Sequence, residues 1–106
     1  MNLDEYQKET SATNLTKDKK AVNVVHVLCG LSAEVGEVEA LFQKAYRGDG
    51  KINHLDLVKE IGDVMWHLSE LCNAFDISLE ACLDVNVKKL KDRKKRNALR
   101  GSGDNR

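Results

Sequence analysis

The fold of this chain is decided by residues 34–63, which read EVGEVEALFQKAYRGDGKINHLDLVKEIGD. This stretch begins and ends with an acidic pair, Glu34 with Glu37 and Glu60 with Asp63, and each pair lies within helical apolar spacing. Residues three apart lie on the same side of a helix, with Cβ atoms about 5–6 Å apart. The glycines of the connecting RGDG, residues 47–50, suit the end of a helix and a short turn. The pattern predicts an antiparallel helical hairpin that can place four carboxylates around one gap.

The acidic pairs have no basic neighbours along the chain. Segment 21–43 contains three acids and segment 60–87 contains six, and neither contains Lys or Arg. Two like charges about 6 Å apart repel by roughly 3 kcal/mol at an effective dielectric constant of about 20. Such a cluster must take up protons or bind a cation, and oxygen-only ligands suit Mg²⁺. Spacing alone leaves two solvated acidic helix faces as an alternative, but the doubled pattern and the missing bases favour a metal site.

Composition and apolar spacing indicate an all-α protein. The chain has 106 residues and no proline, which predicts one domain over residues 1–106. Apolar residues recur at steps of three and four over four segments, residues 2–12, 19–47, 54–75 and 79–97. Four helices from so short a chain enclose little interior, so we expect a four-helix bundle completed by homodimerisation. The glycine-rich residues 101–106 are expected to form a mobile tail.

The cysteines and the lengths of the apolar runs indicate the cellular compartment in which the protein works. Cys29, Cys72 and Cys82 occupy apolar-face positions, where we expect small buried side chains. An odd cysteine count without a signal peptide indicates free thiols in a reducing compartment. No apolar run is expected to approach the roughly 20 residues that span a bilayer. These features predict a cytoplasmic protein that does not bind membranes.

The formal net charge of zero hides a basic segment near the end of the chain. Residues 88–100 contain eight Lys and Arg against one acid, Asp92. Basic runs bind phosphate backbones, so a nucleic-acid-binding helical module is one alternative function. The acidic face would repel such a ligand, and no helix-turn-helix pattern is evident, which makes nucleic acid the weaker candidate. A regulatory helical protein without enzymatic activity is a further alternative.

Three sequence motifs together resemble a known family. They are GLSAEVGEV at residues 30–38, KEIGDVMW at 59–66 and NVKKLKDR at 86–93. The first two resemble the ExxE…ExxD signature of the MazG-like, all-α nucleoside triphosphate pyrophosphohydrolases, and the third resembles that family's N-x-x-K-L-x-x-R stretch. Tyr6-Gln7 and the terminal GSGDNR are also similar to small single-domain members. The resemblance therefore covers nearly the whole chain.

The resemblance implies an enzyme. Members hydrolyse (deoxy)nucleoside triphosphates to the monophosphate and pyrophosphate, in many cases as house-cleaning of the nucleotide pool, and work as homodimers or dimers of dimers. The implied cofactor is Mg²⁺, with Mn²⁺ as a substitute. The implied metal ligands and catalytic residues are Glu34, Glu37, Glu60 and Asp63. Either Glu34 or Glu37 would accept the proton of the attacking water. Related enzymes of this fold that act on dUTP or phosphoribosyl-ATP are not excluded by spacing.

Four residues outside the acidic pairs are candidates for substrate binding. Lys89 and Arg93, four apart on one helical side, can hold the leaving pyrophosphate. Asn86 lies on the predicted inward side of the same helix, where it would contact substrate or a ligand carboxylate. His67, one turn beyond Asp63, would approach the base or sugar, or else make only a local hydrogen bond. The base preference does not follow from these residues.

Two glycines and one tryptophan near the acidic pairs have structural interpretations. Gly30 and Gly36 lie within the second helix, where glycine costs up to about 1 kcal/mol relative to alanine. Close helix packing is the favoured reason for both, and room for substrate beside the carboxylates is the alternative. Trp66 is expected in the core or in a subunit interface rather than under a nucleotide base.

Overall fold

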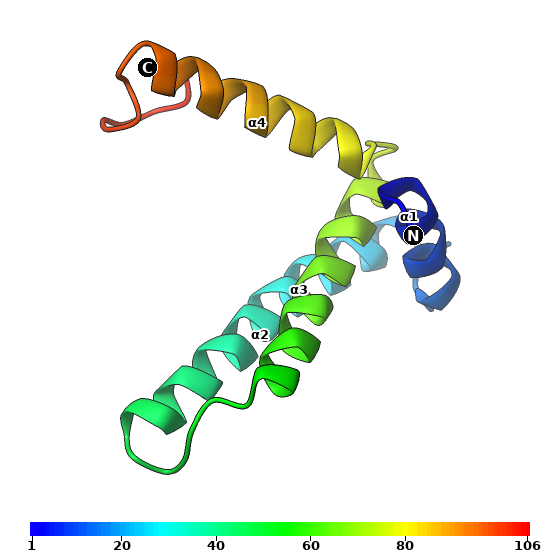
Figure 1. Ribbon diagram of the computed structural model, residues 1–106. Helices are drawn as coiled ribbons and strands as arrows, with labels where there is room; N and C mark the ends of the chain where they lie inside the picture. Colours follow the sequence, from blue (N-terminus) through cyan, green and yellow to red (C-terminus); the bar gives the residue numbers. More distant parts are fainter.

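The computed structural model describes all 106 residues and contains four α-helices and no strands (Figure 1). The helices are α1 (Leu3–Thr13), α2 (Lys20–Tyr46), α3 (His54–Ala74) and α4 (Leu79–Lys95). Each begins and ends within two residues of its predicted bounds, because helical spacing and capping residues are local signals. The all-α class predicted from the sequence is confirmed.

Side-chain caps define the starts of three helices. The Asn2 side chain accepts a hydrogen bond from the Glu5 main-chain N–H at 2.8 Å, and the Glu5 carboxylate accepts one from the Asn2 N–H at 3.2 Å. Asn53 caps α3 by accepting from the Leu55 N–H at 2.8 Å, and Ser78 caps α4. Such caps satisfy main-chain donors that lack partners within the helix.

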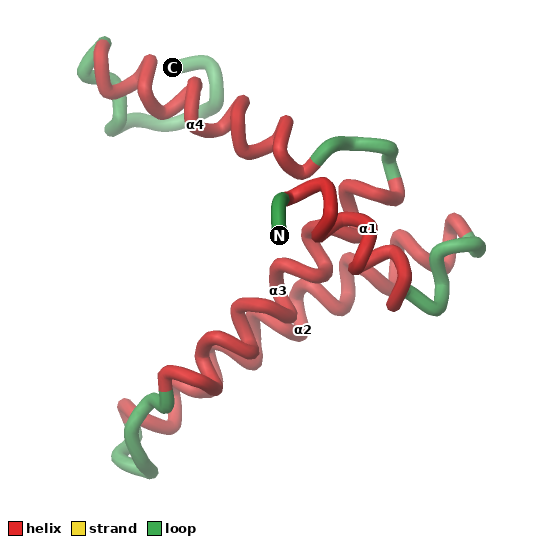
Figure 2. The backbone as a smooth tube through the Cα atoms, turned by 45° about the vertical axis from the view of Figure 1, so that its right-hand side comes forward, coloured by secondary structure: helices red, strands yellow, loops and turns green.

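The helices α2 and α3 form an antiparallel hairpin and run side by side in both backbone views (Figures 1 and 2). Gly48 and Gly50 reverse the chain between them, with φ angles of +88° and +139° that other residues rarely adopt. Helix α1 packs against α3, and the Trp66 indole N–H donates to the Thr13 hydroxyl at 2.8 Å. Trp66 thus joins two helices, as expected of a packing residue.

Helix α4 extends away from the hairpin instead of packing along it (Figures 1 and 2). Its contacts are made chiefly with α1. The radius of gyration is 16.7 Å, whereas a compact chain of about 100 residues has a value of about 13 Å. A single chain therefore does not form a closed four-helix bundle.

Most of the apolar side chains lie in solvent. Only 8 of 106 residues are buried, and just two of these, Val27 and Leu79, are apolar. Many exposed apolar side chains lie on the apolar faces given by helical spacing, and these include Val25, Leu28, Val35 and Phe42 of α2, Val58 and Ile61 of α3, and Leu83 and Leu90 of α4. The prediction of buried cysteines was wrong, because Cys29 and Cys82 lie on these uncovered faces and Cys72 is only half-buried.

Helix α2 is long and apolar. It has 27 residues and an 18-residue window of mean hydropathy 1.3, so by length and composition it could cross a membrane. The expectation that no segment approaches a membrane-spanning length was therefore wrong. Core helices of soluble proteins pass the same test. Its acidic pair, Glu34 and Glu37, would be costly in lipid, and one of its faces already packs on α3.

The best-buried part of the molecule is polar. Glu70 of α3 is 1% exposed, and its carboxylate accepts hydrogen bonds from the Thr10 hydroxyl at 2.8 Å, the Asn73 amide at 2.6 Å and the Asn14 amide at 2.6 Å. The Asn14 amide also lies 2.8 Å from the Asn23 side-chain oxygen. We call Thr10, Asn14, Asn23, Glu70 and Asn73 the Glu70 network; it ties α1, the following loop, α2 and α3 together.

Candidate functional site

The helical hairpin brings carboxylates of both acidic pairs together. One carboxylate oxygen from each of Glu34, Glu60 and Asp63 lies within 4.8 Å of the others. Glu37, one turn beyond Glu34 on α2, is exposed and stands outside this group of three. Glu34, Glu37, Glu60 and Asp63 are called the acidic cluster below. The antiparallel course of α2 and α3 therefore brings three of the four predicted carboxylates together, and the expectation that Glu37 joins them is wrong for this group.

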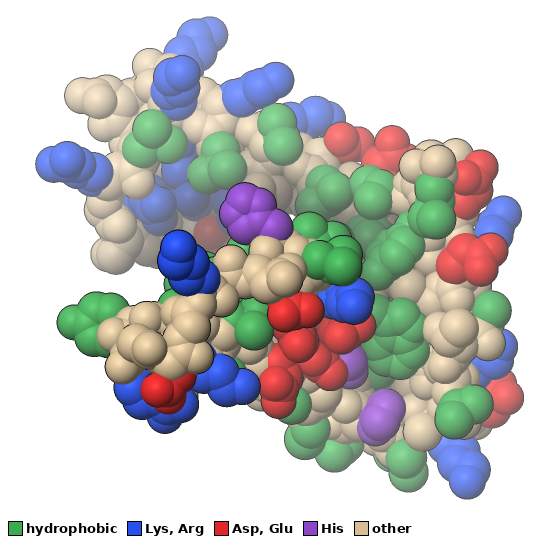
Figure 3. All heavy atoms as spheres, turned by 60° about the horizontal axis from the view of Figure 1, so that its bottom comes forward, with side chains coloured by type: hydrophobic (Ala, Val, Ile, Leu, Met, Phe, Trp, Pro, Cys, Tyr) green, Lys and Arg blue, Asp and Glu red, His purple; other side chains and the backbone are tan.

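The acidic cluster has no neutralising partner within the chain. None of its four carboxylates accepts a hydrogen bond or forms an ion pair. The pKa of Glu60 is raised above its usual value, first by partial loss of hydration and then by the charges of Glu37, Asp63, Glu34 and Asp56. Figure 3 shows a group of acidic side chains near the middle of one face, with hydrophobic and basic side chains beside it and other acidic side chains farther away. The site concentrates negative charge without balancing it.

The donor set of the acidic cluster fits a hard divalent cation. Its converging side chains offer only carboxylate oxygens, which Mg²⁺ prefers over nitrogen or sulfur. The pKa of Glu60 is raised by partial loss of hydration and by repulsion from nearby carboxylates, and a bound cation would relieve that repulsion. Glu34, Glu60 and Asp63 could hold such an ion, with Glu37 at its edge.

A shallow hollow of about 430 Å³ lies between α1 and α3. Its lining is mainly apolar and consists of Met1, Asn2, Leu3, Tyr6, Gly62 and Met65. Gly62, which lines the hollow, directly precedes Asp63, so the hollow adjoins the acidic cluster. The pKa of the Tyr6 phenol is raised by burial and by the charge of Asp63. Helical spacing could not reveal this neighbour, because α1 reaches α3 only through tertiary packing.

His67 is held by local contacts on α3. Its Nδ1 lies 2.9 Å from the main-chain oxygen of Asp63, and its ring meets the Trp66 ring edge-on with centroids 4.8 Å apart. The ring also lies against Gly30 of α2, where a Cβ atom would overlap it. Close packing is thus confirmed as the reason for Gly30, whereas a Cβ at Gly36 would meet nothing within 4 Å.

Comparison with known proteins shows which family the chain belongs to. The family described as the MazG nucleotide pyrophosphohydrolase domain matches residues 24–97. This chain belongs to that family. The Gene 37 protein of Mycobacterium phage L5 is 42% identical over 85 residues, which cover 76% of this chain and 75% of the phage protein. No solved structure matches the chain significantly. The family match includes the acidic cluster and all of α4, and it indicates nucleotide pyrophosphohydrolase activity.

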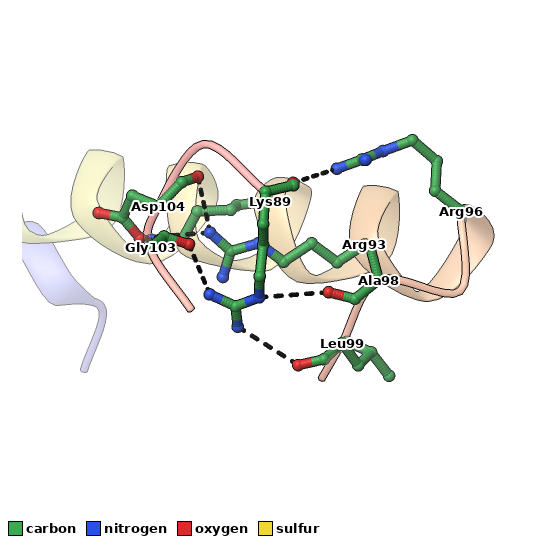
Figure 4. Close-up of polar contacts among 8 residues, drawn as sticks. Lys89, Arg93, Arg96, Ala98, Leu99, Gly103 and Asp104 are labelled. Atoms are coloured by element: carbon green, nitrogen blue, oxygen red, sulfur yellow. Dashed lines mark hydrogen bonds and ion pairs between the residues drawn. The ribbon is translucent and has the colours of Figure 1, made fainter. Parts of the chain in front are cut away.

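The α4 residues of this MazG domain do not reach the acidic cluster of the same chain. Asn86, Lys89 and Arg93 lie on the projecting helix, away from the α2–α3 hairpin (Figure 1). Asn86 is exposed, so its predicted inward position is wrong for the single chain. Lys89 and Arg93 instead contact Asp104 of the C-terminal tail (Figure 4). Local spacing places these residues on one helix side but not beside the acids.

Proposed function

We propose that this protein hydrolyses (deoxy)nucleoside triphosphates to the monophosphate and pyrophosphate in a Mg²⁺-dependent reaction. The observation that carries the proposal is the acidic cluster, in which carboxylate oxygens of Glu34, Glu60 and Asp63 converge to within 4.8 Å and have no partner in the chain. A triphosphate and a divalent cation would together supply the missing partner. The cellular role of the protein would be the removal of unwanted nucleotides from the nucleotide pool.

Glu34, Glu60 and Asp63 would hold Mg²⁺, and the same oxygens would accept Mn²⁺. When bound, the ion supplies positive charge that neutralises phosphate oxygens and acidifies a coordinated water. Glu37 is the better candidate for general base, because it stands outside the converging group and is exposed to solvent. It would accept the proton of the water that attacks the α-phosphorus.

The hollow beside the acidic cluster is suited to the nucleoside. Its apolar lining and the Tyr6 ring offer a surface for a base or sugar next to the residues that would hold the phosphates. His67, anchored to the Asp63 main chain, would keep its outer ring nitrogen directed towards α2 rather than towards substrate. We therefore assign His67 a weaker role in substrate binding than Tyr6.

A second copy of the chain would complete the site. The single chain exposes 8164 Å², whereas a compact monomer of this mass exposes about 6,000 Å². The excess, roughly 2,000 Å², is of the size that obligate homodimers bury. A groove lined only by Val35, Val38, Ile61, Val64 and Met65 lies along the hairpin and could receive apolar side chains of a partner. We propose a homodimer, or a dimer of dimers, in which α4 of one copy brings Asn86, Lys89 and Arg93 to the acidic cluster of the other.

The reaction is tested by incubating the protein with each (d)NTP and Mg²⁺ and separating mono- from diphosphate. Monophosphate and pyrophosphate are expected, and Glu37→Gln should lower the rate by about 10²–10⁴-fold as loss of a general base does. Glu39→Gln is the matched control, because Glu39 is exposed on the same helix and does not affect Glu60. Diphosphate with orthophosphate would show that the wrong bond is cleaved.

The shared site is tested by mixing two inactive variants. Glu60→Gln lacks a carboxylate of the cluster and Arg93→Ala lacks a phosphate-binding base. Mixed dimers would contain one site with both residues intact, so activity should return on mixing. Activity that never returns, in mixtures shown by mass spectrometry to contain mixed dimers, would contradict the shared site.

We further propose that residues 1–106 form a single domain that works in the cytoplasm. The family match covers 24–97, and α1 is tied to the matched part through the Glu70 network. The three free thiols suit a reducing compartment.

A further inference from the structure

The C-terminal tail, residues 101–106, folds back along α4 (Figure 4). The reversal uses left-handed conformations at Asn97, Gly101 and Gly103, with φ angles of +56°, +122° and +82°. The Arg106 guanidinium donates to the main-chain oxygens of Gly103 at 2.6 Å and of Ala98 at 3.3 Å. The tail is thereby shaped into a compact loop against the basic side of α4.

This fold-back brings the carboxylate of Asp104 into contact with the side chains of Lys89 and Arg93. The Asp104 Oδ1 atom accepts from the Lys89 ammonium at 3.0 Å and from the Arg93 guanidinium at 3.3 Å. The same guanidinium donates to the Asp104 main-chain oxygen at 2.8 Å. Arg93 is only 4% exposed as a result, which is unusual for an arginine on a projecting helix. A single anionic oxygen bridging two cations is also what a phosphate oxygen would provide.

We propose that Asp104 is a placeholder for phosphate: without substrate it occupies the anion site of Lys89 and Arg93, and a pyrophosphate group displaces it together with the tail. The kinetic consequence rests on the proposed function, because Lys89 and Arg93 are the residues assigned to the leaving pyrophosphate. The tail then acts as a built-in competitor of the substrate, and its release accompanies substrate binding.

The contacts of the tail suit reversible release. The Asp104 side chain is 79% exposed, so water and salt reach the acidic partner of both ion pairs and screen them, although the Arg93 side chain itself is buried. No apolar side chain of residues 101–106 is available to anchor the loop. The pKa of Asp104 is lowered by the hydrogen bonds from Lys89 and Arg93, so the carboxylate is charged at neutral pH and competes as an anion. A pyrophosphate group carries more charge than this carboxylate and can engage both bases.

The proposal is tested with inorganic pyrophosphate in EDTA, where the acidic cluster has no cation to recruit the ligand. Isothermal titration calorimetry compares the wild type with Asp104→Asn, which removes the competing charge. We expect pyrophosphate to bind Asp104→Asn about three- to tenfold more tightly, which is the usual strength of an ion pair whose acidic partner is open to solvent. Asp92→Asn is the matched control, because it removes the same charge from the same region but Asp92 pairs with Arg96. The affinity of Asp92→Asn for pyrophosphate should equal that of the wild type.

Release of the tail is measured separately by NMR. The amide signals of Gly101 and Gly103 should shift and sharpen when pyrophosphate is added to the wild-type protein. Unchanged or weaker binding in Asp104→Asn would overturn the proposal and make Asp104 a positioning residue. Absence of pyrophosphate binding in both proteins, or bound pyrophosphate with unmoved glycine signals, would overturn it as well.

These outcomes are independent of hydrolysis. If no triphosphate is cleaved but Asp104→Asn binds pyrophosphate more tightly, the tail proposal stands and the proposed reaction fails. If hydrolysis is observed and Asp104→Asn leaves the KM and the pyrophosphate affinity unchanged, the reaction stands and the placeholder fails.

Discussion

Two glutamates on the same helix, Glu60 and Glu70 of α3, have opposite environments. Glu70 is almost fully buried and accepts hydrogen bonds from three neutral side chains of the Glu70 network. Glu60 is only half-buried, accepts none, and has a raised pKa because it loses hydration and faces other carboxylates. The better-buried carboxylate is therefore the better satisfied one.

The difference separates structural from functional charge in this protein. A buried carboxylate is tolerated only when donors are provided by the fold, and Glu70 has them. The acidic cluster lacks such donors, so its charges are completed only by something outside the chain. Cluster variants should therefore affect activity, and Glu70 variants should affect stability.

The largest expected effect is on catalysis. Asp63→Asn should lower kcat/KM by about 10²-fold or more, because one oxygen ligand with its charge is lost from the cation site. The helical circular dichroism should be unchanged, since Asp63 makes no side-chain contact that the fold needs. An Asp63→Asn protein that unfolds would instead make the cluster structural, like Glu70.

The next effect is on stability. Glu70→Gln should lower the free energy of unfolding by about 1–3 kcal/mol, because its amide group would face side chains that are already donors. Urea unfolding at one fixed protein concentration measures the change. Glu39→Gln, an exposed substitution of the same kind, should stay within about 0.5 kcal/mol. Equal midpoints for the two variants would mean that the Glu70 network contributes little.

A pair of glycine variants tests the packing between the two regions. Gly30→Ala should destabilise by about 1–3 kcal/mol, because the new methyl group would displace the His67 ring from its contacts. Gly36→Ala, on the same helix with open space around it, should stabilise by up to about 1 kcal/mol through helix propensity. Thermal unfolding of both variants decides this, and shifts of the same sign would show that His67 yields freely.

The smallest effect concerns pH in metal-free protein. Because the pKa of Glu60 is raised on folding, the folded protein binds a proton that the unfolded chain releases, and stability falls as pH rises from the unfolded pKa of about 4.3 through the folded value. The Glu60→Gln variant has no carboxylate at this position, so its stability does not fall with pH for this reason. It should melt above the wild type at neutral pH and level with it at about pH 4.

Added Mg²⁺ should reverse the order of Glu60→Gln and the wild type, since only the intact cluster gains a ligand. Equal melting temperatures at neutral pH without metal would show that the repulsion at Glu60 is relieved in solution.

The four helices, and the approach of Glu34 to the second acidic pair, could be predicted from the sequence. Caps, apolar spacing and the glycine turn act within a few residues, so local chemistry determines them. The convergence of Glu34, Glu60 and Asp63 follows once the hairpin is antiparallel. These features could be predicted without knowing which helices pack against each other in the folded chain.

Other features were decided by tertiary structure alone. Two of the three donors of Glu70 are Thr10 and Asn14, which lie 60 and 56 positions away. Asp104 contacts bases 15 and 11 residues earlier because the tail reverses direction. The outward course of α4 leaves apolar faces uncovered, which spacing had assigned to a core. The helical period predicts which residues lie on the same side of a helix. What packs against that side depends on segments that are distant in the sequence.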